Sequence, residues 1–118
     1  MTRAEILRAK VSKRIEERSP FKFDIIESNY ETRAKIDDKR LVIEEVFRHN
    51  GTSENCSIRI IVDKVDDWGR VKGLYNSGKI TEKASNRVIN DRIDKALEKF
   101  VYSDPEPFTM DMLDAYYQ

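Results

Sequence analysis

Two short apolar runs separated by a turn-forming gap constrain the fold more than any other feature of this 118-residue sequence. Residues 41–47 and 57–63 are both rich in β-branched side chains, which favour extended strands because their χ1 angles are already restricted. Asn50-Gly51 lies between the two runs, and this pair readily takes the positive φ angles of a chain reversal. The sequence therefore predicts a β-hairpin in the middle of a small antiparallel sheet.

Alternation in the second run predicts which face of that strand is buried. Ile58, Ile60 and Val62 share one face, and Arg59 and Asp63 lie on the other. We therefore expect the three apolar side chains to lie in the core.

The N-terminal segment has the signals of an amphipathic helix. Thr2 and Glu5 have the spacing of a capping box, and Ser19-Pro20 ends the pattern because proline cannot continue the helical hydrogen bonds. The spacing predicts a helix from about residue 3 to residue 18. Its apolar stripe consists of Ala4, Leu7, Val11 and Ile15.

Strand-like alternation covers residues 21–25 and resumes in another phase at residues 30–36. The change of phase across residues 26–29 requires either a bulge or a turn at Ser28-Asn29. Asp37-Asp38-Lys39 then forms a tight turn into the central hairpin. The predicted meander has three strands, or four if the chain reverses at Ser28-Asn29.

Beyond the hairpin, residues 66–102 have the spacing of a helical hairpin. Asp66-Asp67 caps a short first helix, which Gly78 ends, and Thr81 caps a long second helix that reaches about Tyr102. The apolar residues of the first helix, at spacings of three and four, are Trp68, Val71, Leu74 and Tyr75.

The last sixteen residues differ in composition from the rest. Residues 103–107 form an acidic linker with two prolines, and Thr109 caps a short apolar helix. We thus predict an α+β fold: an N-terminal helix, a three- to four-stranded antiparallel β-meander, a helical hairpin and a short C-terminal helix. Residues 1–102 would form a single α+β domain, and residues 103–118 the acidic linker and C-terminal helix.

Composition says more about the cellular compartment of the protein than about the partner that it binds. Lys and Arg total 22 and so do Asp and Glu, but residues 1–22 hold seven bases against three acids, and residues 103–118 hold four acids and no base. The single cysteine, Cys56, fits a reducing compartment. Without a membrane-length apolar stretch or the apolar core of a signal peptide, we expect the cytoplasm of a cell or of an infected host, and no membrane partner. A phage or mobile-element origin suits the size and charge density.

The sequence offers few residues for chemistry. His49 and Cys56 flank the hairpin loop, but no third group is evident to orient them, so we predict no catalytic residue, no enzyme activity and no cofactor. A metal-dependent nuclease is the third-ranked function, because acids near the hairpin could hold Mg²⁺: Glu44, Glu45, Asp63, Asp66 and Asp67. The element order resembles a restriction-type nuclease core, whose acid–spacer–lysine pattern is matched best by Asp37-Asp38-Lys39. We predict no resident metal.

Nucleic-acid binding is the second-ranked function. The order helix, three strands, helix resembles a double-stranded-RNA-binding domain, and residues 66–102 offer a helix-turn-helix alternative. The basic side chains of the N-terminal helix that would contact phosphates are Arg3, Arg8, Lys10, Lys13 and Arg14.

The first-ranked function is that of a small non-enzymatic protein-interaction protein: an accessory factor, an inhibitor or an assembly component. Large apolar and aromatic side chains on an acidic helix suit a partner's groove. The predicted partner-binding residues are Phe108, Met110, Leu113, Tyr116 and Tyr117. The partner would be another protein, or a second copy in a homo-oligomer.

Overall fold

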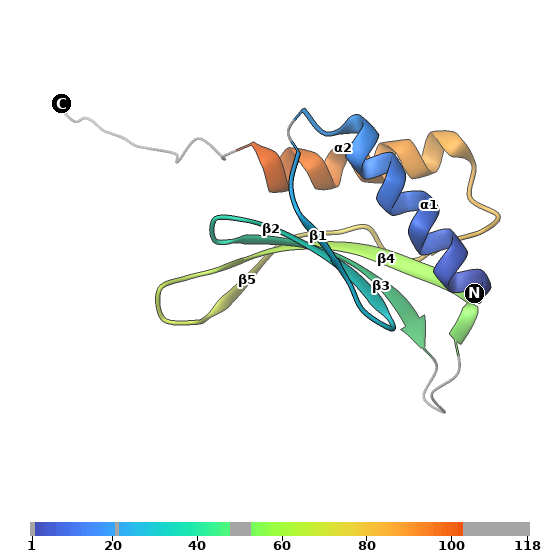
Figure 1. The fold of residues 1–118 in the computed structure, drawn as a ribbon, viewed down its shortest axis with the longest axis horizontal. Coiled ribbons are helices and arrows are strands. Elements are labelled where there is room, and N and C mark those ends of the chain that lie inside the picture. The colour runs from blue at the N-terminus through green and yellow to red at the C-terminus, as the bar shows by residue number, and fades with distance from the viewer. Residues whose placement is uncertain (1, 21, 48–52, 103–118) are drawn as a thin grey trace.

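An antiparallel sheet carries both helices of the described chain on one of its faces (Figure 1). The computed structural model describes residues 2–20, 22–47 and 53–102. The elements in chain order are α1 (Arg3–Arg18), β1 (Ile25–Glu27), β2 (Glu31–Ile36), β3 (Lys39–Phe47), β4 (Ser53–Val65), β5 (Val71–Asn76), β6 (Ile80–Thr81) and α2 (Asn86–Val101). The predicted mixture of helices and antiparallel strands is confirmed.

β4 is the longest strand of the described sheet and pairs with three others. The spatial order is β1-β2-β3-β4-β5, and the short strand β6 pairs with the first part of β4. β3 and β4 form the predicted central hairpin, with Ile43 opposite Ile60 and Leu41 opposite Val62. β4 therefore has a hydrogen-bonded neighbour on each side along most of its length.

The core lies between the sheet and the two helices. Ile58, Ile60 and Val62 are 0% exposed, which confirms the predicted buried face. They pack in one cluster with side chains from both helices, namely Leu7, Val11, Ile15, Ile89, Ile93, Ala96, Leu97 and Phe100.

α1 begins and ends as the sequence predicts. The side chain of Thr2 accepts from the backbone N–H of Glu5, the side chain of Glu5 accepts from the backbone N–H of Thr2, and Ser19 is the C-cap. These Thr2 contacts lower the pKa of the Glu5 carboxyl below its usual range. The predicted apolar stripe is buried: Ala4, Leu7, Val11 and Ile15.

The chain reverses at Ser28-Asn29, so the meander has four strands before β5. Both the backbone N–H and the hydroxyl of Ser28 donate to the carbonyl oxygen of Glu31. The next reversal, between β2 and β3, occurs at residues 37–38 as predicted, with Asp37 at a φ of 54°. Asp tolerates this left-handed conformation better than most residues.

The predicted helical hairpin is wrong, because residues 71–76 form a strand instead of a helix. Apolar spacings of three and four fitted a helix, but Gly73 would weaken a helix interior and Val71 and Tyr75 favour strands. β5 instead extends the sheet, with Tyr75 opposite Val62 and a bulge beside this pair. The helix-turn-helix interpretation of residues 66–102 therefore lacks its first helix.

α2 is shorter than predicted at its start. Its N-cap is Ser85, whose hydroxyl accepts from the backbone N–H of Val88, and not Thr81. Thr81 belongs to β6, where it lies opposite Ser57, and the neighbouring Ile80 is buried opposite Ile58. Because Thr81 pairs with β4, the cap of the helix lies four residues later than predicted. The predicted C-terminal helix lies outside the described residues.

Truncating the centre of the buried face should be costly. We expect Ile60→Ala to destabilise the protein by roughly 2–5 kcal/mol, because the deletion leaves a cavity in a well-packed core. Ile26 is 69% exposed, so Ile26→Ala is the matched control and should change stability by less than about 0.5 kcal/mol. Urea denaturation of the three proteins measures both effects. A loss below about 1 kcal/mol for Ile60→Ala would mean that this face is not the core.

Candidate interaction surface

The hairpin that joins β4 to β5 ends in a tightly bonded turn. The backbone N–H of Gly69 donates to the carbonyl oxygen of Asp66, and the N–H of Asp66 donates to the carbonyl oxygen of Arg70. Gly69 has a φ of 78°, a conformation that glycine takes without a steric penalty. A turn followed by a left-handed residue is a common way to close a three-residue hairpin loop.

The carboxylate of Asp66 forms hydrogen bonds with the backbone and a side chain of this turn. Its Oδ1 atom accepts from the backbone N–H groups of Trp68 and Arg70, at 2.9 and 2.8 Å. Its Oδ2 atom accepts from Nε of the Arg70 side chain at 3.1 Å. One carboxylate therefore holds the backbone on both sides of Trp68.

The turn presents a large aromatic side chain to solvent. Trp68 is 83% exposed, more than any other large hydrophobic side chain in the described residues, and Val71 beside it is 58% exposed. The hairpin extends to the end of the molecule at which α2 also ends (Figure 1). We call the turn of residues 66–70 the hairpin tip. It is an ordered turn that holds one tryptophan in an exposed position.

The sheet face opposite the helices carries ion pairs between neighbouring strands. Two cross-strand ion pairs lie on it: Arg40 binds Asp63 through two hydrogen bonds of 2.7 and 3.1 Å, and Arg59 lies 3.6 Å from Glu44. The bonds to Asp63 raise the pKa of the Arg40 guanidinium further above its ordinary value. These two pairs join β3 to β4 on this face and neutralise four of its charges.

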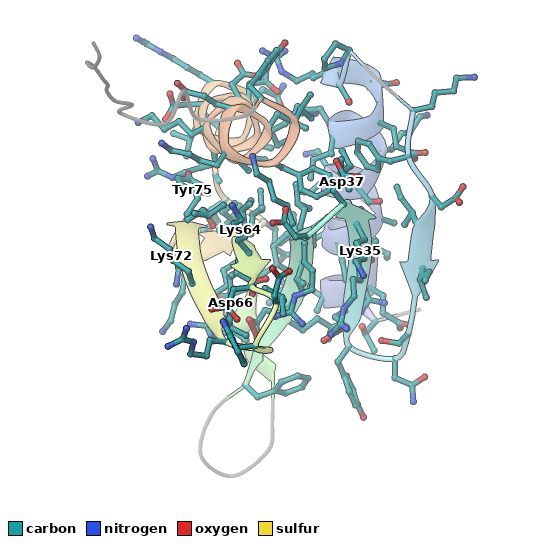
Figure 2. The ribbon with its side chains drawn as sticks, turned by 90° about the vertical axis from the view of Figure 1, so that its left-hand side faces the viewer. Lys35, Asp37, Lys64, Asp66, Lys72 and Tyr75 are labelled. Carbon is teal, nitrogen blue, oxygen red and sulfur yellow. The ribbon has the colours of Figure 1, made fainter. Side chains whose placement is uncertain are left out.

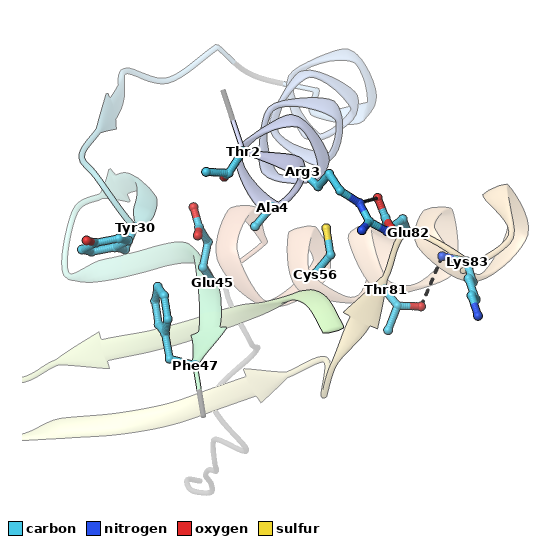
Figure 3. A pocket seen from close by; sticks show the side chains of 10 residues that line it. All are labelled: Thr2, Arg3, Ala4, Tyr30, Glu45, Phe47, Cys56, Thr81, Glu82 and Lys83. Carbon is cyan, nitrogen blue, oxygen red and sulfur yellow. Dashed lines mark hydrogen bonds and ion pairs between the residues drawn. The ribbon is translucent and has the colours of Figure 1, made fainter. Parts of the chain in front are cut away.

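A pocket of about 910 Å³ lies between the start of α1, the end of β3 and the segment after β6 (Figure 3). Cys56 and Glu45 line it, and the rings of Tyr30 and Phe47 meet edge to face at its margin, with centroids 5.0 Å apart. Cys56 has a φ of 50° in an irregular part of β4. His49, the other residue considered above for a Cys–His pair, lies outside the described residues.

Glu45 is the buried charge of this pocket. It is 6% exposed and its Oε2 atom lies 3.4 Å from Nη1 of Arg8, which is 5% exposed. Burial raises the pKa of the Glu45 carboxyl, and the nearby Arg8 partly opposes that rise. Arg8 also donates from Nη2 to the carbonyl oxygen of Ser28, so one arginine links α1 to β3 and to the β1–β2 turn.

The acids that the sequence offered as metal ligands do not converge. Four of them pair with four different arginines: Glu44 with Arg59, Glu45 with Arg8, Asp63 with Arg40 and Asp66 with Arg70. Within residues 2–20, 22–47 and 53–102, no cluster of three or more His, Cys, Asp or Glu side chains could hold a metal ion.

The three arginines of α1 that were proposed for nucleic-acid binding have separate partners within the fold. Arg3 pairs with Glu82, Arg8 with Glu45, and Arg14 donates to the side-chain oxygens of Asn86 and Asn90 at 3.3 Å. Two further cations proposed for nucleic-acid binding, Lys10 and Lys13, are exposed. Three arginines thus contact other elements of the protein's own fold, and two lysines remain exposed on the surface.

The predicted partner-binding residues lie outside the described part of the chain: Phe108, Met110, Leu113, Tyr116 and Tyr117. Sequence reasoning missed the hairpin tip because Trp68 was placed on the apolar stripe of a helix. The signal was present in Asp66-Asp67-Trp68-Gly69, an Asp-initiated turn that ends in glycine between two strand-forming runs.

Comparison of the chain with protein-family models, curated proteins and solved structures gave no match. No helix among the described residues is long and apolar enough to span a membrane.

The buried Arg8–Glu45 pair gives a pH-dependent prediction. Arg8→Met removes the charge that lowers the pKa of Glu45, so that carboxyl stays protonated to a higher pH in the folded protein than in the unfolded chain. The folded state then loses stability as the pH rises through the carboxyl range. We expect a loss of about 3 kcal/mol at neutral pH and a smaller loss near about pH 4, measured by urea denaturation.

The double variant Arg8→Met/Glu45→Gln is the control, because it removes both charges. It should regain the pH-dependent part of the stability and keep only the constant cost of the lost bond to Ser28. An equal loss for Arg8→Met at both pH values would show that Glu45 is not held in a buried, charged state by Arg8.

Proposed function

We propose that this chain is a small non-enzymatic protein that binds another protein, or a second copy of itself, by surface contact. It would serve as an accessory factor, an inhibitor or an assembly component. The observation that supports this proposal best is the exposed Trp68 on the hairpin tip.

The tip has the properties of a binding hot spot. Tryptophan is among the residues that contribute most binding energy at protein interfaces, because its large ring buries much area and loses few rotatable bonds. Asp66 already holds the backbone around Trp68, so binding would not have to order the turn. With 83% of its surface exposed, Trp68 buries little area in the described fold and leaves most of its ring area for a partner.

The C-terminal partner-binding residues stay a prediction, and their attachment point supports a joint surface. α2 ends at Val101, at the same end of the molecule as the β4–β5 hairpin (Figure 1). A partner that contacts Trp68 is therefore within reach of residues 103–118. These residues include Phe108, Met110, Leu113, Tyr116 and Tyr117.

Nucleic-acid binding stays the second-ranked alternative. On α1 its support now comes mainly from Lys10 and Lys13, because the arginines proposed for phosphate contacts have partners in the fold. A gel shift with DNA and RNA at increasing salt discriminates between the two functions, since phosphate contacts weaken steeply with ionic strength.

Trp68→Ala should weaken partner binding without affecting the fold. For a hot-spot tryptophan we expect a loss of at least about 2 kcal/mol, or roughly 30-fold in affinity, and a change in unfolding free energy within about 0.5 kcal/mol. The assays are affinity capture from cells that express the chain, followed by titration of the captured protein, and sedimentation velocity for self-association.

Tyr30→Ala is the matched control, because Tyr30 is an aromatic residue with 60% exposure in the turn between β1 and β2, away from the β4–β5 hairpin. Deletion of residues 103–118 tests the C-terminal contact in the same assays. If Trp68→Ala retains wild-type affinity for every captured protein and the same sedimentation behaviour, the hairpin tip is not the contact surface.

A further inference from the structure

Three lysines lie directly opposite one another on three neighbouring strands. Lys39 on β3 pairs with Lys64 on β4, and Lys64 pairs with Lys72 on β5. Leu41 and Val62 are the next inward-facing residues on β3 and β4, so the three lysines share the sheet face that carries the helices. Figure 2 looks onto this end of the molecule, with Lys64 and Lys72 below α2. We call these three residues the lysine row.

The lysine row is short of negative charge. Like charges directly opposite each other on paired strands repel, and strands lie about 4.8 Å apart. Lys64 lies 3.5 Å from a carboxylate oxygen of Asp38, and both side chains are nearly half exposed. Lys72 has no ion-pair partner among the described residues. Within the described part of the chain, one carboxylate is therefore at ion-pair distance from the three lysines, and an acidic ligand would relieve their repulsion.

The C-terminal segment begins at this row. Nζ of Lys39 donates to the carbonyl oxygen of Tyr102 at 3.1 Å. Tyr102 is the C-cap of α2 and has an extended backbone, with φ −93° and ψ 129°. The first lysine of the row thus binds the last described residue of the chain, and residues 103–118 follow from that point.

The residues that follow have complementary charge. Residues 103–118 contain four acids and no base, and the first two acids, Asp104 and Glu106, each precede a proline. A residue before proline is biased toward extended conformations. Two and four extended residues span roughly 7 and 14 Å, while the row spans two strand spacings, or about 10 Å. Asp104 and Glu106 can therefore reach the second and third lysines from Tyr102.

We propose that the acidic stretch 104–107 of this chain binds the lysine row of its own domain. Asp104 and Glu106 supply the carboxylates, and Lys64 and Lys72 supply the ammonium groups. Each exposed ion pair is weak, but the tether gives the carboxylates an effective concentration on the order of millimolar. The contact fixes the direction in which the rest of residues 103–118 leaves the domain, whatever its later partner is. It does not depend on the function proposed for Trp68.

Carbodiimide cross-linking of the full chain tests this contact, because the reagent joins an amine to a carboxylate that touches it. We expect links from Lys64 and Lys72 to Asp104 or Glu106, identified by mass spectrometry. Lys35 is the matched control, since it lies at the same end of the sheet on the opposite face (Figure 2). Links from Lys64 and Lys72 to Asp104 or Glu106 should exceed links from Lys35 to the same two acids several-fold. They should disappear in about 1 M NaCl, where the screening length is roughly 3 Å.

A mixture of unlabelled and isotope-labelled chains separates the possible occupants. Links within one chain support the proposal, whereas links that join a labelled to an unlabelled chain would show that a second copy occupies the row and would overturn it. Equal linking of Lys35 and the lysine row, or no link to Lys64 and Lys72, would also overturn it.

Chymotrypsin supplies a second readout, because Phe108 and the tyrosines of the segment are cleavage sites. Lys64→Gln/Lys72→Gln should speed cleavage within residues 103–118 several-fold, while Lys10→Gln/Lys35→Gln, with the same change in charge, should leave the rate unchanged. Equal rates in the two variants would contradict the contact. Neither variant changes Trp68, so the contact of the lysine row and the function proposed for Trp68 are tested independently of each other.

Discussion

Burial of the inward face of β4 is the interaction on which the other features of this molecule depend. Ile58, Ile60 and Val62 are completely buried, and each such side chain contributes about 1.5–3 kcal/mol when it leaves water. Both helices pack on this face, so their positions follow from it. β4 then continues past the core to Val65, where it leads directly into the hairpin tip. The strand that holds the fold together is also the one that carries Trp68 to the surface.

Many charged side chains on the rest of the described surface form ion pairs with one another. Arg18 binds Asp94 through two hydrogen bonds of 2.7 and 2.6 Å, which lower the pKa of that carboxyl, and thereby join the end of α1 to α2. Further arginines bind the acids of the outer sheet face and of the hairpin tip. Most arginines of the described residues are paired in this way, whereas three lysines are aligned in the lysine row with one carboxylate near them.

The sequence predicted the elements whose signals are local. The capping box of Thr2 and Glu5, the alternation of Ile58, Ile60 and Val62, and the turn at Asp37 each reflect interactions within a few residues. Residues 66–85 were harder because apolar spacings of three and four fit both a helix and a twisted, bulged strand. Pairing of β5 and β6 with β4 decided the outcome, and such long-range pairing is not encoded in periodicity.

The candidate surfaces were less predictable than the fold for a related reason. Exposure of Trp68 follows from the position of the hairpin relative to the core, and an aromatic residue in an apolar pattern is more commonly buried. The lysine row depends on strand register, which aligns Lys39, Lys64 and Lys72 although they are far apart in sequence. Likewise, the sequence shows that Arg8 is basic, but it does not show that Arg8 is buried beside Glu45.

Fluorescence of Trp68, the single tryptophan of the chain, tests the central claim that a free aromatic side chain is held ready for a partner. In the dilute full-length protein the emission maximum should match that of tryptophan in water, because the side chain is 83% exposed. Complex formation with a captured partner, or self-association at higher concentration, should shift the emission to shorter wavelengths. Emission at short wavelength in the dilute chain, or no shift when a complex forms, would contradict this account.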